Sequence, residues 1–187
     1  NHNQALEVLN EIHKSKIPNH KIQLLSFIKK FPKIFSDEYI IEYLSDNSSA
    51  IKNATLDFLI SNPKNVFFEK IVFLLGEPET EKKAKQAILA LNKSWTFEKL
   101  IKIISNPATE TKYAKPILNI MHYFDDRRLI KIILELIKSH HISIINESSN
   151  CLIKISKLNN ININELYKIE EYIKIIAKRA FQLHLFR

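Results

Sequence analysis

The sequence predicts an all-α fold made of short helices that follow one another in pairs. Three observations predict it. The chain has one Gly in 187 residues, whereas hairpins and many strand connections need glycine where the backbone takes a positive φ. Apolar residues recur at helical spacing, as in Phe97, Leu100, Ile101 and Ile104. Long segments repeat with a period near 30 residues, which is typical of arrays of helix pairs.

The repeat is clearest when residues 68–91 are set over residues 97–120. Phe-Glu-Lys opens both segments, and a Pro and a Thr recur in both turns, all at an offset of 29 residues without a gap. A further shift of 29 places the Leu-Ile-Lys-Ile-Ile of 100–104 on the same five residues at 129–133. We interpret each unit as two short helices joined by a polar turn. Helices this short are marginal alone, so they bury their apolar faces by stacking on their neighbours.

Cap signals and periodicity place the helices in order along the chain. Pro18 suits the first turn of a helix, and Ser36, Asn65 and Thr96 are candidate N-caps. Apolar residues recur at helical spacing up to Leu183 and predict a last, long helix that caps the open end of the stack. The predicted helices are 3–15, 18–31, 36–45, 48–61, 65–76, 79–93, 96–105, 109–124, 126–139, 142–159 and 163–184.

No stretch rich in Gly, Ser or Pro divides the chain. The sequence therefore predicts a single domain over residues 1–187. We expect an irregular N-terminal helix pair at 1–33, repeats over 36–158 and the capping helix at 163–184.

The formal net charge of +8 suggests a nucleic-acid partner, but the kind of basic residue argues against it. The chain has 24 Lys and only 4 Arg, whereas base and phosphate recognition relies on the forked Arg side chain. Basic residues exceed acidic ones by 2 in residues 1–95 and by 6 in residues 96–187. The composition therefore favours a protein partner over nucleic acid.

The residues that usually carry chemistry form no recognisable site. His140 and His141 are adjacent, so on a helix they point about 100° apart and cannot readily share one metal ion. His122 has no third ligand at a suitable spacing. Cys151 is the only cysteine and falls on an apolar helix, which predicts core packing and a reducing compartment. We predict no catalytic residue, no cofactor and no metal site.

Two features bear on the cellular context. No run of about 18 uncharged apolar residues occurs, so no membrane-spanning segment is predicted. The chain begins at Asn1 and its only Met is Met121, which indicates a piece of a larger protein. We expect a cytoplasmic location.

The stretch 44–59 resembles a HEAT repeat, whose pattern is a Leu, an Asp in the turn, a Val-Arg pair, an Ala and a Leu. In that pattern the turn Asp can accept hydrogen bonds from free N–H groups at the start of the second helix. The basic residue reaches acids in adjacent turns, and the Ala lets helices approach closely. The matching residues here are Leu44, Asp46, Ile51, Lys52, Ala54 and Leu59, with Glu77, Lys85, Asn106 and Lys115 in the later units.

The resemblance covers residues 36–158 and implies a right-handed α-α superhelix of about five helix pairs. HEAT arrays act mostly as scaffolds, adaptors and docking surfaces. The run closed by the segment 169–183 is also similar, more faintly, to the cytoplasmic HEAT regions of bacterial nucleotide-translocase-like membrane proteins. The resemblance therefore implies a non-catalytic scaffold, alone or as the cytoplasmic region of a larger membrane protein.

If the second helices line the concave face, as in the family, their Lys residues form a basic stripe there. The alternative is a solvated face of a Lys-rich chain. Arg127 and Arg128 are adjacent at a predicted turn and helix start, and this pair also suits docking of a partner. The candidate partner-binding residues are Lys52, Lys82, Lys85, Lys112, Lys115, Arg127 and Arg128.

A second functional class stays open. HEAT-like alkylpurine DNA glycosylases clasp DNA in a basic concave groove with aromatic residues and a catalytic Asp. Their signature residues have no match that we can place here. The alternative to a protein-binding scaffold is therefore a HEAT-like DNA-binding protein or glycosylase.

Overall fold

The computed structural model describes residues 2–15, 17–28, 36–106, 108–124, 126, 128–138, 142–158 and 174. Among these residues every regular element is a helix and no strand occurs, so the all-α prediction is confirmed. Within the same residues, no helix combines the length and the apolar character needed to cross a membrane. The helices are α1 (His2–Lys14), α2 (Pro18–Ile28), α3 (Asp37–Leu44), α4 (Ser49–Ser61), η1 (Asn65–Phe67), α5 (Phe68–Leu74), α6 (Glu81–Ala90), α7 (Lys93–Ile104), α8 (Thr111–Met121), α9 (Arg128–Leu136) and α10 (Ile142–Leu158).

Each helix predicted between residues 3 and 159 has a counterpart, with ends that differ by a few residues. The predicted N-cap at Thr96 is wrong, because α7 begins at Lys93 and Thr96 lies inside it, fully buried. The side-chain oxygen of Asn92 accepts a hydrogen bond from the Trp95 N–H at 3.1 Å and so caps this helix instead. The predicted capping helix at 163–184 lies outside the described residues apart from Lys174.

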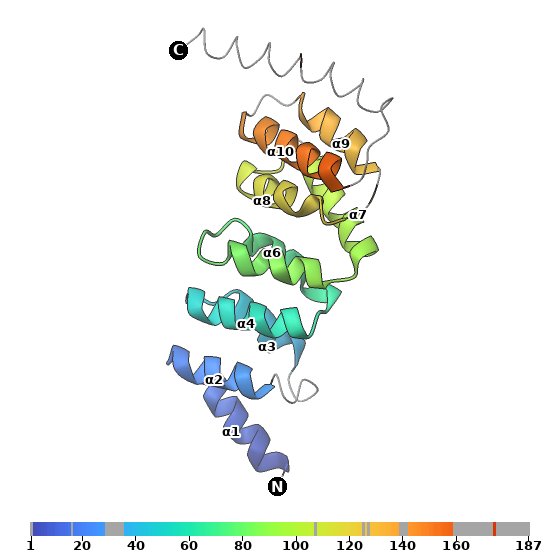
Figure 1. Ribbon diagram of the computed structural model, residues 1–187. Coiled ribbons are helices and arrows are strands. Elements are labelled where there is room, and N and C mark those ends of the chain that lie inside the picture. The colour runs from blue at the N-terminus through green and yellow to red at the C-terminus, as the bar shows by residue number, and fades with distance from the viewer. Residues whose placement is uncertain are drawn as a thin grey trace, which may run out of the picture. The chain divides into compact units, whose positions relative to one another are not determined.

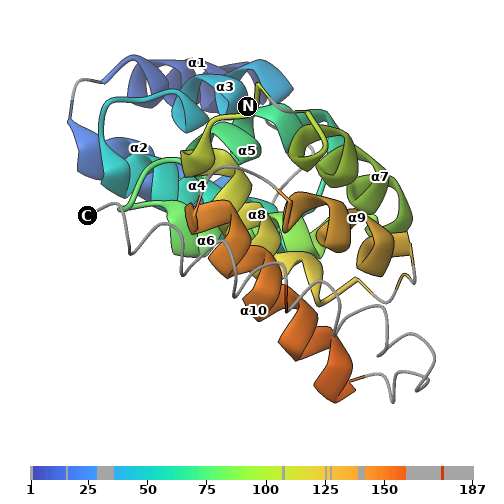
Figure 2. The same cartoon turned by 90° about the horizontal axis from the view of Figure 1, so that it is seen from above.

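The chain divides into two compact units, Asn1–Thr96 and Phe97–Arg187. In the first unit α1 packs against α2, α3 against α4, and α5 against α6. Helix α4 also packs against both α2 and α6, so the second helices of three successive pairs form one layer (Figure 1). Figure 2 shows α1 and α3 along one side of this unit, with α2, α4 and α6 along the other.

The second unit is organised around α10, which packs against both α8 and α9. Each of these helices contributes buried residues, such as Ile117, Ile133 and Cys151. The rings of Phe97 and Phe124 lie 5.8 Å apart between centroids and extend this core toward the start of the unit.

The internal repeat has a direct structural meaning, because matching positions are buried in both copies. Phe68 and Phe97 are 3% and 2% exposed, and Ile88 and Ile117 are both fully buried. These pairs stand at the repeat offset of 29 residues. Recurring apolar residues such as these four therefore contribute to the core of each helix pair.

The recurring Thr of the repeat closes the end of the first helix. The Thr80 hydroxyl donates to the Leu74 carbonyl at 2.8 Å, and the Thr109 hydroxyl donates to the Ile103 carbonyl at 2.5 Å. Both carbonyls belong to the last turn of a helix, where they also accept backbone hydrogen bonds, from the Glu77 N–H at 3.3 Å and from the Asn106 N–H at 3.2 Å. The same residue at the same spacing thus ends the first helix of two successive pairs.

Burial in the second-helix layer should dominate the stability of the first unit. We expect Ile88→Ala to lower the free energy of unfolding by about 2–5 kcal/mol, since it removes a fully buried side chain from α6. Gln86→Ala, at an exposed position of the same helix, should change it by less than about 0.5 kcal/mol. Urea unfolding followed by circular dichroism measures both, and similar losses for the two variants would contradict the proposed core.

Candidate functional site

Two ion pairs join successive helix pairs in the first unit, and we call them the repeat ladder. Lys21 of α2 donates to the Asp46 carboxylate at 2.9 Å, and Lys52 of α4 contacts the Glu77 carboxylate at 2.7 Å. In each case a second helix reaches the turn of the next pair, 25 residues further along the chain. The HEAT pattern predicts that its basic residue reaches an acid in an adjacent turn, and Lys52 does so. Lys85 instead pairs with Glu81 of its own helix, and Lys115 lies near Glu147 of α10.

Asp46 is the most fully engaged acid of the ladder. Its Oδ1 accepts a hydrogen bond from the Ser48 N–H at 2.9 Å, just before α4 begins, while its Oδ2 accepts from Lys21. Burial alone would raise the pKa of Asp46, but the hydrogen bonds from Ser48 and Lys21 outweigh it and hold this pKa below its ordinary value. The predicted role of the turn Asp is confirmed for this residue.

The turn motif recurs where the sequence keeps an Asp or an Asn. The side-chain oxygen of Asn106 accepts from the Ala108 N–H at 3.0 Å, and that of Asp126 accepts from the Arg128 N–H at 2.9 Å. Both are turns in which a short side chain replaces a backbone acceptor two residues before its donor. The Asp or Asn at this position therefore has a structural role in its turn.

The predicted Lys stripe is largely engaged within the chain. Lys52 belongs to the repeat ladder and its side chain is 14% exposed, and Lys85 pairs with Glu81 one helical turn earlier. Lys82 is exposed on the same helix, and no ion pair of the described residues includes it. Of the predicted stripe residues on α4 and α6, one is thus exposed and two are paired, and Lys83 of α6, which the stripe did not include, pairs with Asp57 of α4.

The remaining stripe residues lie on α8 in the second unit. Lys112 pairs with Glu110 at 2.9 Å, and Lys115 lies 3.9 Å from Glu147 of α10. Both Lys side chains are more than half exposed, so these pairs contribute little to stability. A single stripe along both units stays a prediction.

Of the predicted Arg pair, Arg127 lies outside the described residues. Arg128 donates to the Asp126 carboxylate through Nε and Nη2, contacts Glu98 at 2.6 Å and lies 5.3 Å from the centroid of the Phe97 ring. These carboxylates, Asp126 first, raise the pKa of Arg128. The guanidinium holds the start of α9 against α7, and a docking partner would have to compete with both acids.

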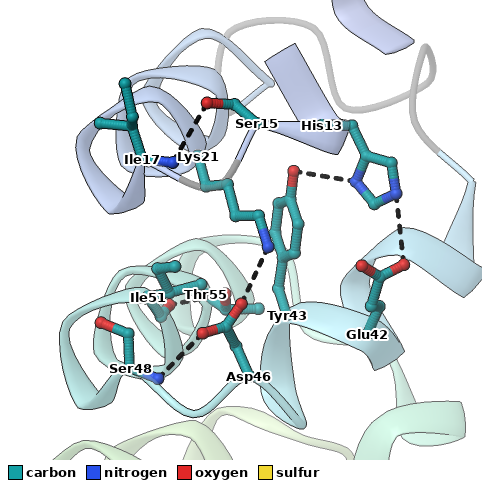
Figure 3. A network of polar contacts seen from close by, with 10 residues as sticks. All are labelled: His13, Ser15, Ile17, Lys21, Glu42, Tyr43, Asp46, Ser48, Ile51 and Thr55. Atoms are coloured by element: carbon teal, nitrogen blue, oxygen red, sulfur yellow. Dashed lines mark hydrogen bonds and ion pairs between the residues drawn. The ribbon is translucent and has the colours of Figure 1, made fainter. Parts of the chain in front are cut away.

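A polar network that sequence reasoning missed connects α1, α2 and α3 (Figure 3). The His13 ring contacts the Tyr43 hydroxyl through Nδ1 at 3.1 Å and the Glu42 carboxylate through Nε2 at 3.2 Å. The Lys21 ammonium group lies above the Tyr43 ring, 5.4 Å from the ring centroid, and also pairs with Asp46. His13 and Tyr43 are 30 residues apart along the chain, which is close to the repeat period. That spacing is the one signal in the sequence that relates the two residues.

Ser15 and His20 form a second polar contact at the turn between α1 and α2, with Ser15 Oγ 2.9 Å from His20 Nδ1. They border a hollow that Glu11, Ile12 and Lys14 also line. A nucleophilic Ser needs N–H donors aimed at the oxyanion of its substrate. The Ile17 N–H instead donates to Ser15 Oγ itself at 3.2 Å, as in an ordinary polar turn. The contact therefore shapes this turn.

Cys151 lies in α10 and is 1% exposed, which confirms the predicted core position. Burial raises its pKa to about 12, so the thiol stays protonated and unreactive at neutral pH. Burial also lowers the pKa of His122, with a further contribution from Lys154. Within the described residues, no group of three or more His, Cys, Asp or Glu side chains is arranged to hold a metal ion.

No protein-family model matches this chain, and comparison with curated proteins finds no match.

The ladder should stabilise the first unit far more than an exposed ion pair does. Asp46→Asn keeps the acceptor for the Ser48 N–H but removes the charge that faces Lys21, whose side chain is only 15% exposed. We expect it to lower the free energy of unfolding at pH 7 by about 1–3 kcal/mol. The matched control, Asp37→Asn, loses a half-exposed pair with Lys64 and should cost about 0–1 kcal/mol.

The sign of the pH dependence follows from the lowered pKa of Asp46. Its contribution is present above the pKa of an unfolded Asp, about 3.9, and is lost as the pH falls through the lower native value. The difference between wild type and Asp46→Asn should therefore shrink toward pH 2 in urea titrations. A difference that persists at that pH would assign the cost to the amide itself.

Proposed function

We propose that this chain is a non-catalytic helical-repeat scaffold of the HEAT type that presents the surface of its second helices to a macromolecular partner. The observation that carries the proposal is the repeat ladder, in which Lys21–Asp46 and Lys52–Glu77 join three successive helix pairs. Asp46, Lys52 and Glu77 of the ladder are among the residues that resemble the turn acid and the basic residue of the HEAT pattern.

The physical argument starts from rigidity. A scaffold binds well when its surface is ordered before the partner arrives, because less conformational entropy is then lost on binding. Helix α4 is tied to the turn before α6 by Lys52 of the ladder and by a hydrogen bond from Asn53 to the Glu79 carbonyl at 3.1 Å. It is tied to α6 itself by packing and by an Asp57–Lys83 ion pair. The second-helix layer is therefore the better ordered candidate for a docking face.

We further propose that the pairs continue as a right-handed superhelix with the second helices on the concave face. We also propose a cytoplasmic setting, either alone or as the cytoplasmic region of a larger membrane protein, in keeping with the buried free thiol of Cys151. A protein partner is preferred to nucleic acid because the Lys groups of the ladder are already engaged with carboxylates.

The superhelix has a size that can be measured. A compact 187-residue domain would have a radius of gyration of about 16 Å. We expect small-angle X-ray scattering to give a clearly larger value and an asymmetric distance distribution, as an open stack requires. A radius near 16 Å with a symmetric distribution would rule the superhelix out.

The docking face can be tested with charge-matched variants. Lys82→Glu with Lys112→Glu changes exposed positions of second helices α6 and α8. Lys70→Glu with Lys131→Glu makes the same change of charge at exposed positions of α5 and α9. We expect the first double variant to weaken binding of a partner captured from cell extract at least about tenfold, and the second to leave it within about twofold.

The affinities are measured with the purified partner, and cross-linking locates the contact. Equal effects of the two double variants, or cross-links confined to α1, α3 and α5, would contradict docking on the second helices.

The DNA-binding alternative predicts duplex binding that weakens steeply with salt as phosphate contacts are lost. We expect no duplex binding at low salt, and binding with a steep salt slope would favour the alternative.

A further inference from the structure

In the turn of the first helix pair, a serine stands where the next two pairs have an acid. Ser15, Asp46 and Glu77 follow one another at an offset of 31 residues. The helices after the first two of these turns, α2 and α4, begin at Pro18 and Ser49, which are separated by the same offset. Ser15 is therefore the counterpart of the acids that receive the Lys side chains of the repeat ladder.

The buried residues of α2 and α4 support this correspondence. Leu25 and Leu56 are both buried, and so are Ile28 and Leu59. The residues of each of these two pairs are 31 positions apart. The equivalence of Ser15 and Asp46 thus holds for the packing of the two second helices as well as for the sequence.

The side chains of Ser15 and Asp46 also make the same backbone contact. Ser15 Oγ accepts a hydrogen bond from the Ile17 N–H at 3.2 Å. Asp46 Oδ1 accepts one from the Ser48 N–H at 2.9 Å, so in both turns the donor lies two residues further along the chain (Figure 3). The two side chains differ in charge, because the serine hydroxyl is neutral and has no second oxygen for a cation.

The surroundings of Ser15 suit a larger anionic group. Its Oγ lies 2.9 Å from Nδ1 of the exposed His20. Both residues border a surface hollow that Lys14 also lines, so there is space beside the hydroxyl. In the sequence, Lys14 and Lys16 flank Ser15. Glu11 lines the same hollow and is the charge that opposes an anion there.

We propose that Ser15 is a phosphorylation site, and that its phosphoryl group supplies the negative charge that Asp46 and Glu77 carry in the later turns. A protein kinase transfers the γ-phosphoryl group of a nucleoside triphosphate to Ser15 Oγ. The bond from the γ-phosphorus to its bridging oxygen breaks, a P–Oγ bond forms, the hydroxyl proton passes to a base of the kinase, and a nucleoside diphosphate leaves. The inference is independent of the proposed scaffold function, because it concerns the chemistry of one turn.

The phosphoryl group stabilises the start of α2. A phosphoserine carries a charge of roughly −1.5 to −2 at neutral pH and has three acceptor oxygens. It can therefore keep the hydrogen bond from the Ile17 N–H and also accept from His20 and Lys14, which lie beside the same hollow. A negative charge beside the first turn of a helix is favourable as well. Phosphorylation thus converts the first turn from a neutral contact to a charged one.

Labelling of the full chain tests whether the site is used. The purified chain is incubated with γ-labelled ATP and an extract of the cells that express it, and the labelled residues are identified by mass spectrometry. We expect label on Ser15 in the wild type and its loss in Ser15→Ala. Ser94→Ala changes an exposed serine that also follows a lysine but lies inside α7, and this variant should keep the label. A wild type without label on Ser15, or total label that is unchanged in Ser15→Ala, would overturn the proposal.

The effect on the turn is measured separately, on full-length chains made with phosphoserine at position 15. We expect amide hydrogen exchange at pH 7.5 to show the opening of residues 22–25 of α2 reduced about threefold, as a charge near a helix start predicts. The matched control carries phosphoserine at position 26, an exposed site in the last turn of the same helix, where a negative charge should not reduce the opening. Equal opening with and without the phosphoryl group at position 15, or an equal reduction from position 26, would contradict the proposed role of the charge.

Discussion

The short length of the helices is the constraint on which the rest of this structure depends. Helix α3 has 8 residues and α5 has 7, and helices of this length are not stable alone in water because nucleation outweighs so few hydrogen bonds. Their stability must come from neighbours, which is why α3 buries Ile40, Tyr43 and Leu44 within one turn and a half. Within the first unit each of these short helices therefore depends on packing against its neighbours.

Apolar burial explains why the pairs stack, but it does not fix how they align, because it is nearly independent of direction. Polar contacts with defined geometry are better suited to that task. The ladder pairs Lys21–Asp46 and Lys52–Glu77 lie at the same position in successive repeats, and Thr80 and Thr109 close the first helix of their pairs in the same way. We interpret these contacts as the features that set the register of the stack.

The use of polar side chains to align the helix pairs bears on function. The same Lys residues that look like a binding stripe in the sequence include one, Lys52, that is needed inside the stack and another, Lys85, that pairs on its own helix. A partner of the second-helix face would meet exposed groups such as Lys82 and the polar surface around them. The His13 network stands apart, because it joins α1 to α3 through hydrogen bonds to a group that can change its charge.

The sequence by itself determined the helical class and, to within a few residues, the places of the helices between residues 3 and 159, because helical periodicity and the repeat of Phe68 at Phe97 are local patterns that survive without tertiary information. It also indicated that Asp46 shapes its turn, since the donor is only two residues away. It did not place the start of α7, where the side chain of Asn92 rather than that of Thr96 caps the helix. Only the tertiary structure decided that Lys21 faces Asp46 and that His13 meets Tyr43 and Glu42. Those contacts depend on how side chains from separate helices meet in three dimensions, and no spacing along one helix encodes that geometry.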